Sequence, residues 1–160
     1  MDQENLSASR TVAAPAERVF AVLADPTTHP AIDGTGWVHK AVDRAPLTAA
    51  GQIFRMDMYH PGHPEVNYQM ANKVQVLEPP HAISWLPGRA AQAGHLEFGG
   101  WFWRYDLEPL GPAETEVTLT YDWSGVAQFI REYLQFPPFG PEHLGNSLGH
   151  LAELAAARQG

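Results

Sequence analysis

One stretch, residues 99–125 (GGWFWRYDLEPLGPAETEVTLTYDWSG), restricts the fold of this chain more than any other part. It holds two runs in which apolar and polar residues alternate, joined at Gly111-Pro112, and this period of two predicts two long antiparallel strands. Burying one large side chain stabilises a fold by roughly 1.5 to 3 kcal/mol, so another element must cover the apolar face. The residues expected on that face are Trp101, Trp103, Tyr105, Leu107, Val117, Leu119, Tyr121 and Trp123.

The other strands are expected from the same period of two. The chain contains 14 prolines and 14 glycines, which are dispersed as turn markers between the alternating segments. Consecutive strands with short connections indicate an antiparallel meander. Strands are predicted at residues 6–13, 36–43, 51–60, 65–77, 82–86, 95–108 and 115–123.

Helices are expected where apolar residues recur at spacings of three and four. Residues 16–23 place an apolar stripe behind Pro15, and Asp25-Pro26 ends this helix. A second, very short helix is predicted within residues 27–33. Residues 125–141 predict a short amphipathic helix with a proline-rich arm, and residues 141–157 predict a long last helix. The leucine-rich face of this last helix is the expected cover of the aromatic sheet.

Composition and charge limit the classes of partner. With 18 acidic and 10 basic residues the formal net charge is −8, so nucleic acid and anionic membranes are not expected partners. The absence of cysteine excludes disulfides and thiolate metal sites. No secretion signal or membrane-spanning run is found, so we expect a cytoplasmic protein without membrane insertion. The length predicts one domain over residues 1–160, as a monomer or a homodimer.

The order of the predicted elements, with four stretches of sequence, resembles the helix-grip fold of the START-like/SRPBCC (Bet v 1-like) superfamily. The stretches are AAPAERVFAVLADPTTHPAIDGTG, NKVQVLEPPHAISWLPG, WRYDLEPLGPAETEVTLTYDWSG and HLGNSLGHLAELAA. They look like the bacterial members described as polyketide cyclase/dehydrase-like. The resemblance implies an α+β fold: a curved seven-stranded antiparallel sheet wrapped around a long C-terminal helix, with two short helices after the first strand. It also implies an apolar cavity between sheet and helix.

The inner faces carry residue types that suit a pocket for an apolar ligand. Methionines adapt to irregular contents, and several lie beside aromatic residues. A dense core with methionines as gap-fillers explains the pattern equally well; the family resemblance favours the cavity. The residues expected to contact a ligand are Phe54, Met56, Met58, Met70, Asn72, Trp85, Trp101, Trp103, Tyr105, Leu119, Trp123, Phe129, Tyr133, Leu144, Ser147, Leu148 and Leu151.

Three polar residues on the predicted inner faces are the candidate catalytic groups: His60, Tyr68 and Tyr121. His60 is the most natural proton carrier because the reference pKa of histidine is near neutral, although a solvated loop position is the competing interpretation. His60 and His63 have no third ligand at chelating spacing, so no metal site is expected. No nucleophile elbow, phosphate loop or dinucleotide fingerprint occurs, and no cofactor is expected.

Other conspicuous residues are given structural interpretations. His29 and Asp33 belong to ordinary turn chemistry. Arg104 and Asp106 on one strand, and Arg55 and Asp57 on another, should point away from the aromatic face. We expect them to take part in cross-strand ion pairs on the outer surface of the sheet, so they are not candidates for the site. Gly99-Gly100 predicts a bulge or a close backbone approach, and a bulge would exchange the faces of Phe98 and Phe102 with those of the inner set.

Three functions remain open at this point. The first is binding of a hydrophobic, partly polar small molecule, lipid- or polyketide-like, between sheet and last helix, with residues 126–139 as a lid. The second, implied by the resemblance, is cyclisation or dehydration of a polyketide-like substrate by positioning and acid/base help. The third is a non-catalytic interaction domain of the co-chaperone type. The sequence leaves open whether any reaction is catalysed, because the inner faces carry no paired carboxylates.

Overall fold

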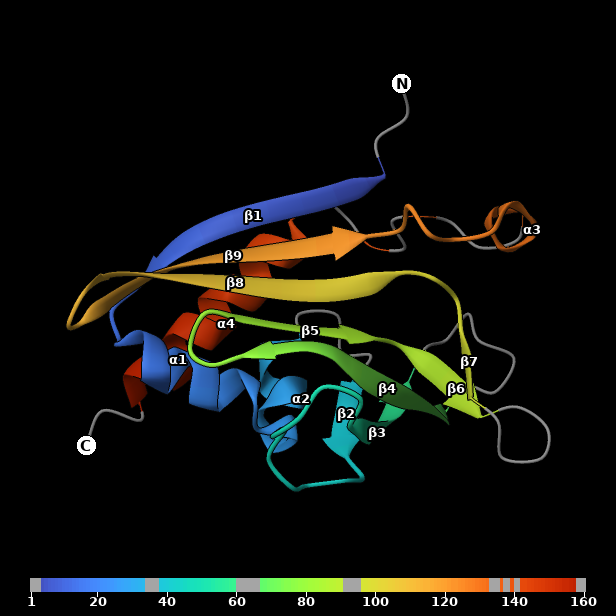
Figure 1. Cartoon of the computed structure of the whole chain (residues 1–160), viewed down its shortest axis with the longest axis horizontal. Helices are drawn as coiled ribbons and strands as arrows, with labels where there is room; N and C mark the ends of the chain where they lie inside the picture. The colour runs from blue at the N-terminus through green and yellow to red at the C-terminus, as the bar shows by residue number, and fades with distance from the viewer. Residues whose placement is uncertain are drawn as a thin grey trace.

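Figure 1 shows the computed structural model of the chain, which describes residues 4–33, 38–59, 67–90, 96–132, 136, 139 and 142–157. The strands are β1 (Asn5–Val12), β2 (Val38–Ala41), β3 (Ile53–Tyr59), β4 (Asn67–Glu78), β5 (Ala82–Leu86), β6 (Gly88–Ala90), β7 (Leu96–Phe98), β8 (Phe102–Gly111) and β9 (Glu114–Asp122). The helices are α1 (Ala16–Leu23), the 3-10 turn η1 (Pro26–Thr28), α2 (His29–Ile32), α3 (Gln128–Arg131) and α4 (His143–Ala157).

Seven of the strands form one antiparallel sheet in the order β1-β9-β8-β5-β4-β3-β2. The helix α4 lies against this sheet and contacts β1 and β9, while α1 and α2 pack beside α4 (Figure 1). The predicted α+β helix-grip fold, with two short helical elements after the first strand, is therefore confirmed. Strands β6 and β7 form a separate two-stranded sheet that the sequence did not predict as such.

The strand predicted at residues 95–108 is broken at Gly99-Gly100 into β7 and β8. Gly100 has a φ of 101°, and a Cβ atom there would overlap the carbonyl group of Gly125. Gly99-Gly100 was predicted to mark a bulge or a close backbone approach, and the close approach is confirmed. The inner face keeps its predicted phase, because Tyr105 and Leu107 are buried.

The face of the sheet predicted for Val76 is wrong, because β4 contains a bulge just before this residue. The pairing of β4 with β5 shifts between Val74 and Val76, which leaves Gln75 as the extra residue. Beyond the shift, Leu77 lies opposite the buried Ile83 and packs on the core. The alternation along residues 66–76 predicts that Val76 shares the inner face with Met70 and Asn72; it lies instead opposite Ser84, on the other face of the sheet.

The two longer helices bury the faces that their spacing predicted. The buried residues of α1 are Ala16, Val19, Phe20, Val22 and Leu23. In α4 the buried positions include Leu144, Ser147, Leu148, Leu151 and Ala155, whereas Gly145, Asn146 and Glu153 are exposed. Pro15 occupies the N-cap position of α1 and makes no side-chain capping hydrogen bond.

The outer face of the sheet is polar and carries two ion pairs of the described residues. Arg55 on β3 binds Asp43, which follows the neighbouring strand β2, at 2.8 Å, and Arg104 binds Asp106 two residues along its own strand at 3.0 Å. The hydrogen bonds from Arg55 lower the pKa of the Asp43 carboxyl group. The prediction that these charges avoid the inner face is confirmed, as is cross-strand pairing for Arg55; for Arg104 the pair lies within one strand. In the described part of the chain no helix is both long and apolar enough to cross a membrane.

Candidate functional site

Four aromatic rings gather where α2 meets the inner face of the sheet. We call His29, Phe54, Trp85 and Tyr105 the α2 aromatic group. The His29 ring stacks on Trp85 with centroids 5.0 Å apart and meets the edge of Phe54 at 5.5 Å, and Trp85 stacks on Tyr105 at 6.0 Å. His29 Nε2 donates a hydrogen bond of 2.9 Å to the Leu23 carbonyl oxygen. The structural role predicted for His29 is confirmed.

A second set of rings gathers where α4 begins. We call Trp103, Tyr121, Phe139 and His143 the α4 aromatic group. The ring of Phe139 is 5.0 Å from Tyr121, 5.6 Å from Trp103 and 4.5 Å from His143, so it touches all three other members. Trp103 and Tyr121 are themselves 4.6 Å apart. Phe139 therefore covers a patch built jointly by the sheet and the start of α4.

The two groups meet at one pair of neighbouring strands. Trp85 on β5 lies directly opposite Trp103 on β8, so both side chains leave the same face of the sheet. The Trp85 ring nevertheless turns to Tyr105 and His29, whereas the Trp103 ring turns to Tyr121. The inner face is thus divided into two aromatic regions.

Burial sets the protonation of the ionisable groups in both regions. It raises the pKa of the Tyr105 and Tyr121 hydroxyl groups well above the usual range, so both remain hydrogen-bond donors at neutral pH. It lowers the pKa of the His29 and His143 imidazoles, although nearby carboxylates, including Asp33 for His143, act in the opposite direction. Both imidazoles are therefore neutral at pH 7, and His143 can accept or donate a hydrogen bond.

Several buried polar side chains on the inner side lack a described partner. No hydrogen bond joins the side chains of Asn72, Tyr105, Tyr121, His143 or Ser147 to another residue in the ranges that the structure describes. Yet no fully enclosed side-chain nitrogen or oxygen among those residues is unsatisfied. The polar atoms of these five side chains therefore keep some accessible surface, although each residue is at most 7% exposed.

Most of the residues predicted to contact a ligand lie together on the inner side of the sheet and on α4. Phe54, Met56, Asn72, Tyr105, Leu119, Tyr121, Trp123, Leu144, Ser147, Leu148 and Leu151 are buried. Met58, Trp85, Trp101 and Trp103 are half-buried and pack on the core, and Met70 is half-buried. Phe129 is 65% exposed and does not join them. Tyr133 lies outside the described residues.

Of the three predicted catalytic residues, the structure describes the side chain of Tyr121 alone. Tyr121 is buried in the α4 aromatic group. His60 lies outside the described residues, as does His63, and of Tyr68 only the backbone is described, opposite Met58. Within the ranges given above, no three His, Asp or Glu side chains are grouped closely enough to hold a metal ion.

Sequence reasoning missed His143 and Phe139. His143 precedes Ser147 by four residues, so extending the buried face of α4 by one turn toward its start would have found it. Phe139 stands in a proline-rich stretch without periodicity and gave no signal. Both residues belong to the α4 aromatic group.

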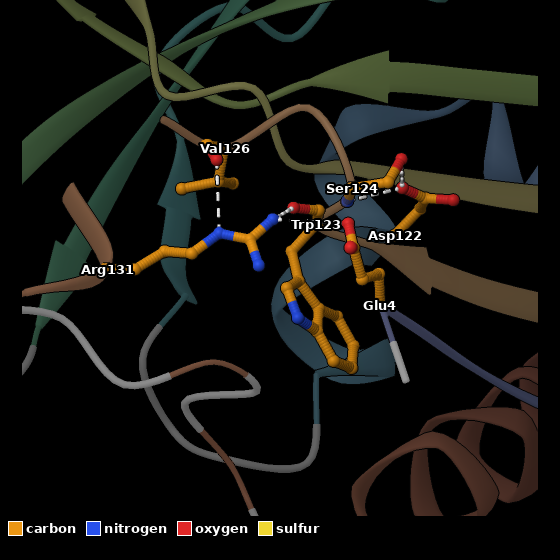
Figure 2. A network of polar contacts seen from close by, with 6 residues as sticks. All are labelled: Glu4, Asp122, Trp123, Ser124, Val126 and Arg131. Carbon is orange, nitrogen blue, oxygen red and sulfur yellow. Dashed lines mark hydrogen bonds and ion pairs between the residues drawn. The ribbon is translucent and has the colours of Figure 1, made fainter. Parts of the chain in front are cut away.

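The segment that joins β9 to α4 is fastened at its start by Arg131, as Figure 2 shows. Arg131 donates hydrogen bonds to the carbonyl oxygens of Trp123 at 2.7 Å and Val126 at 3.1 Å, and it pairs with the Glu4 carboxylate at 3.3 Å. Helix α3, where the predicted amphipathic helix was expected, has only four residues and none is buried. Farther along, Phe136 packs on Trp101 at 5.6 Å.

Comparisons with known proteins identify relatives of this chain. The family model described as "Activator of Hsp90 ATPase homolog 1-like protein" matches residues 13–136. Two uncharacterized proteins of Mycobacterium tuberculosis, Rv0088 from strain H37Rv and MT0096 from strain CDC 1551, are 32% and 31% identical over 150 residues. Each alignment covers 94% of this chain and 61% of the relative, so the chain spans less than two thirds of the curated relatives' length.

Solved structures from other organisms share the fold. Protein NE0264 from Nitrosomonas europaea superposes with a TM-score of 0.69 at 17% identity, covering 99% of both chains. Protein Ms6760 from Mycobacterium smegmatis gives 0.65 at 19% identity, covering 96% of this chain and 91% of that one. Norcoclaurine synthase from Thalictrum flavum, in complex with dopamine and hydroxybenzaldehyde, gives 0.63 at 14% identity, covering 98% and 88%. Such identities show the fold alone.

The sheet wrapped on α4 and the match over residues 13–136 agree on one assignment. They confirm the resemblance to the START-like/SRPBCC superfamily. The chain belongs to the activator of Hsp90 ATPase homolog 1-like (AHSA1) family.

Proposed function

We propose that the protein binds a hydrophobic, partly polar small molecule between the inner face of the sheet and α4. The observation that carries this proposal is the set of five buried polar side chains without a described partner, among them Tyr121, His143 and Ser147. Their polar atoms keep accessible surface, so they are open to a partner from outside the chain. A ligand that offers hydrogen-bonding groups can pair with them, and each such bond contributes about 0.5 to 1.5 kcal/mol.

The α4 aromatic group supports an aromatic or otherwise flat apolar ligand. Rings prefer offset-stacked or edge-to-face neighbours, and Trp103 and Tyr121 present such surfaces from the sheet. Phe139 belongs to the segment before α4 and is half-buried, so its ring is the part of this cover that a ligand can displace. The structure of norcoclaurine synthase in complex with dopamine and hydroxybenzaldehyde indicates that this fold accommodates small aromatic molecules. A lipid- or polyketide-like molecule with a flat apolar part fits the same surfaces.

The test combines identification of a ligand with a variant that fills the space. Native mass spectrometry of freshly purified protein should show a co-purifying small molecule, and calorimetric titration should show binding of neutral aromatic compounds. Ser147→Phe, on the buried face of α4, should weaken binding at least about tenfold. Asn146→Phe, on the exposed face of the same helix, is the matched control and should bind as the unmodified protein does. Absence of any bound molecule and of any titratable binding would refute the proposal.

A second candidate function is catalysis in the same place, such as cyclisation or dehydration of a polyketide-like substrate. A neutral imidazole at His143 and a protonated hydroxyl group at Tyr121 are both in contact with Phe139, which favours acid/base help to a ligand that takes its place. His143→Gln and Tyr121→Phe should then abolish turnover of a substrate while affinity changes little. The earlier candidates His60 and Tyr68 are tested in the same assay by His60→Ala and Tyr68→Phe.

A third candidate function, protein interaction of the co-chaperone type, is favoured by the name of the family. The exposed side chains of Phe129 and Leu110 offer small apolar contact surfaces to a partner protein. Stimulation of the ATPase of an Hsp90-type chaperone by the purified chain would support this function. Failure of Phe129→Ala and Leu110→Ala to reduce such stimulation would show that these two residues are not the contact.

A further inference from the structure

The charges around the inner face are unevenly distributed. All lysine and arginine residues except Arg158 lie within the described ranges, and not one of them is buried. Arg104 points to the outer face, where it binds Asp106, and Arg131 is held by backbone carbonyl groups and Glu4. The exposed ones are Arg10, Lys40, Arg44, Arg55, Lys73 and Arg89, and Arg18 lies outside the buried face of α1. Of these, the guanidinium of Arg10 lies beside α4: its Nη1 would be 3.7 Å from a Cβ atom at Gly149, on the flank of the helix that faces β1. No described guanidinium or ammonium group belongs to either of the two aromatic groups.

The buried histidines do not supply positive charge either. Burial lowers the pKa of both His29 and His143, so both rings are neutral near pH 7. His29 is in addition committed to the Leu23 carbonyl oxygen. An anionic ligand in contact with these groups would lack a cationic partner, and burying an unpaired charge is strongly unfavourable.

One carboxylate, by contrast, lies where α2 ends and β2 begins. Asp33 directly follows α2, and its Oδ2 accepts a hydrogen bond from the Val38 amide at 3.2 Å. The preceding residue, Ile32, is fixed to α4 because its carbonyl oxygen accepts a hydrogen bond from His150 Nδ1 at 3.1 Å. Asp33 therefore lies at the junction of α2, β2 and α4.

The negative charge of Asp33 affects the pKa of ionisable groups on two elements of the candidate site. Its carboxylate favours a higher pKa both for Tyr105, on the inner face of β8, and for His143, at the start of α4. Glu142, which is exposed beside His143, adds a second negative charge, and the neighbouring His150 acts on His143 in the opposite sense. Asp33 and Glu142 thus bring two carboxylates near His143, and Asp33 also acts on Tyr105.

We propose that the site accepts aromatic molecules that are uncharged or carry a protonated amine, and that Asp33 discriminates against carboxylates. This inference rests on the proposed function and specifies the class of ligand. A protonated amine gains attraction from Asp33 and from the faces of nearby rings such as Trp103. A carboxylate of the same skeleton loses its hydration, finds no described cation in the two aromatic groups and is repelled by Asp33.

The test uses three probes that differ only in one end group: 4-phenylbutylamine, 4-phenylbutan-1-ol and 4-phenylbutanoate. At pH 7 they are a cation, a neutral molecule and an anion. Isothermal titration calorimetry with the full chain should give the order amine, alcohol, carboxylate, with the amine binding at least about tenfold more tightly than the carboxylate. Equal or tighter binding of the carboxylate, with the alcohol bound, would overturn the inference and leave the proposed function intact. Absence of binding by the alcohol and the amine up to about 1 mM would count against both.

The assignment to Asp33 is tested by Asp33→Asn, whose side-chain oxygen can still accept the hydrogen bond from Val38. The preference for amine over carboxylate should shrink to less than about threefold in this variant, while affinity for the alcohol stays the same. Asp57→Asn removes the same charge from the outer face, where Asp57 accepts a hydrogen bond from Gln69, and should keep the full preference. An unchanged preference in Asp33→Asn, with the fold intact by circular dichroism, would refute the role of Asp33.

Discussion

The α2 aromatic group and the α4 aromatic group each combine three large rings with one buried histidine, but they hold that histidine differently. In the α2 group, His29 donates to the Leu23 carbonyl oxygen and packs between two rings of the sheet. In the α4 group, His143 has no hydrogen-bond partner in the described ranges and is covered by Phe139. The buried histidine therefore has a hydrogen-bond partner in one region and none in the described part of the other.

The difference indicates how this fold separates stability from binding. A polar group with a partner in the protein rigidifies its surroundings, whereas a polar group that keeps accessible surface can take its partner from a ligand. Changes in the α2 group should consequently alter the free energy of unfolding. Changes in the α4 group should alter binding and leave unfolding less affected. The following predictions test this contrast, from the largest expected effect to the smallest.

Removing one phenyl ring from each group should give the largest contrast. Phe54 is 1% exposed, so Phe54→Ala should lower the free energy of unfolding by about 3 to 5 kcal/mol. Phe139 is half-buried, so Phe139→Ala should cost less than about half as much. Urea denaturation followed by tryptophan fluorescence measures both values. Equal losses would mean that Phe139 belongs to the core as firmly as Phe54 does.

Replacing the two histidines separates their roles. His29→Ala should lower the free energy of unfolding by about 2 kcal/mol, because the Leu23 carbonyl oxygen loses its donor. His143→Ala should change it by less than about 1 kcal/mol but weaken binding of 4-phenylbutan-1-ol about tenfold. Urea denaturation and calorimetry give the two quantities for each variant. The contrast fails if His29→Ala weakens binding and leaves stability unchanged.

The stability of the protein should fall as the pH is lowered through the range just below 6.5. Burial lowers the pKa of His29 and His143 in the folded state, so the unfolded chain binds protons first as the pH drops past 6.5. The stabilising contribution is complete above that value and is lost progressively until the lower folded-state pKa is reached. Urea denaturation between about pH 7.5 and 5 should show this loss. The slope should flatten in His29→Gln, and an unchanged slope in that variant would assign the effect to other groups.

The smallest effect is expected for the hydrogen bonds by which Arg131 holds residues 126–132. Arg131→Ala removes two charge-assisted hydrogen bonds to the carbonyl oxygens of Trp123 and Val126, and half-exposed bonds of this kind contribute about 1 kcal/mol. Hydrogen exchange should become faster at the amides of Ile130 and Glu132. Arg104→Ala, which breaks an ion pair on the outer face, is the matched control and should leave those amides unchanged.

Much of the fold followed from periodicity, because alternation along a strand reports directly which side is buried. The inner positions Tyr105, Leu119 and Tyr121 were predicted in the right phase. Val76 was not, since the extra residue Gln75 shifts the pairing and an isolated sequence carries no signal for a bulge without glycine. Periodicity thus predicts the wrong buried face where a bulge changes the pairing of a strand with its neighbour.

The candidate site was predictable only in its apolar part. Leu144, Leu148 and Leu151 repeat at helical spacing, so their burial was expected and is observed. His143 stands in the first turn of α4, where a polar residue normally faces solvent. Its burial depends on Phe139 and Trp103, which come from two other segments. Helical spacing from Ser147 does indicate that His143 is buried, but the residues that cover it are set by tertiary packing and leave no local pattern.

The contact between Gly100 and Gly125 has a consequence for how this scaffold can change. A Cβ atom at Gly100 would overlap the Gly125 carbonyl group, so the two backbones meet without intervening side chains. The segment that leaves β9 therefore starts from a fixed point on the sheet, whatever sequence follows it. Loop grafting beyond Glu132 can exchange the cover of the α4 aromatic group while this anchor and the strands below it stay in place.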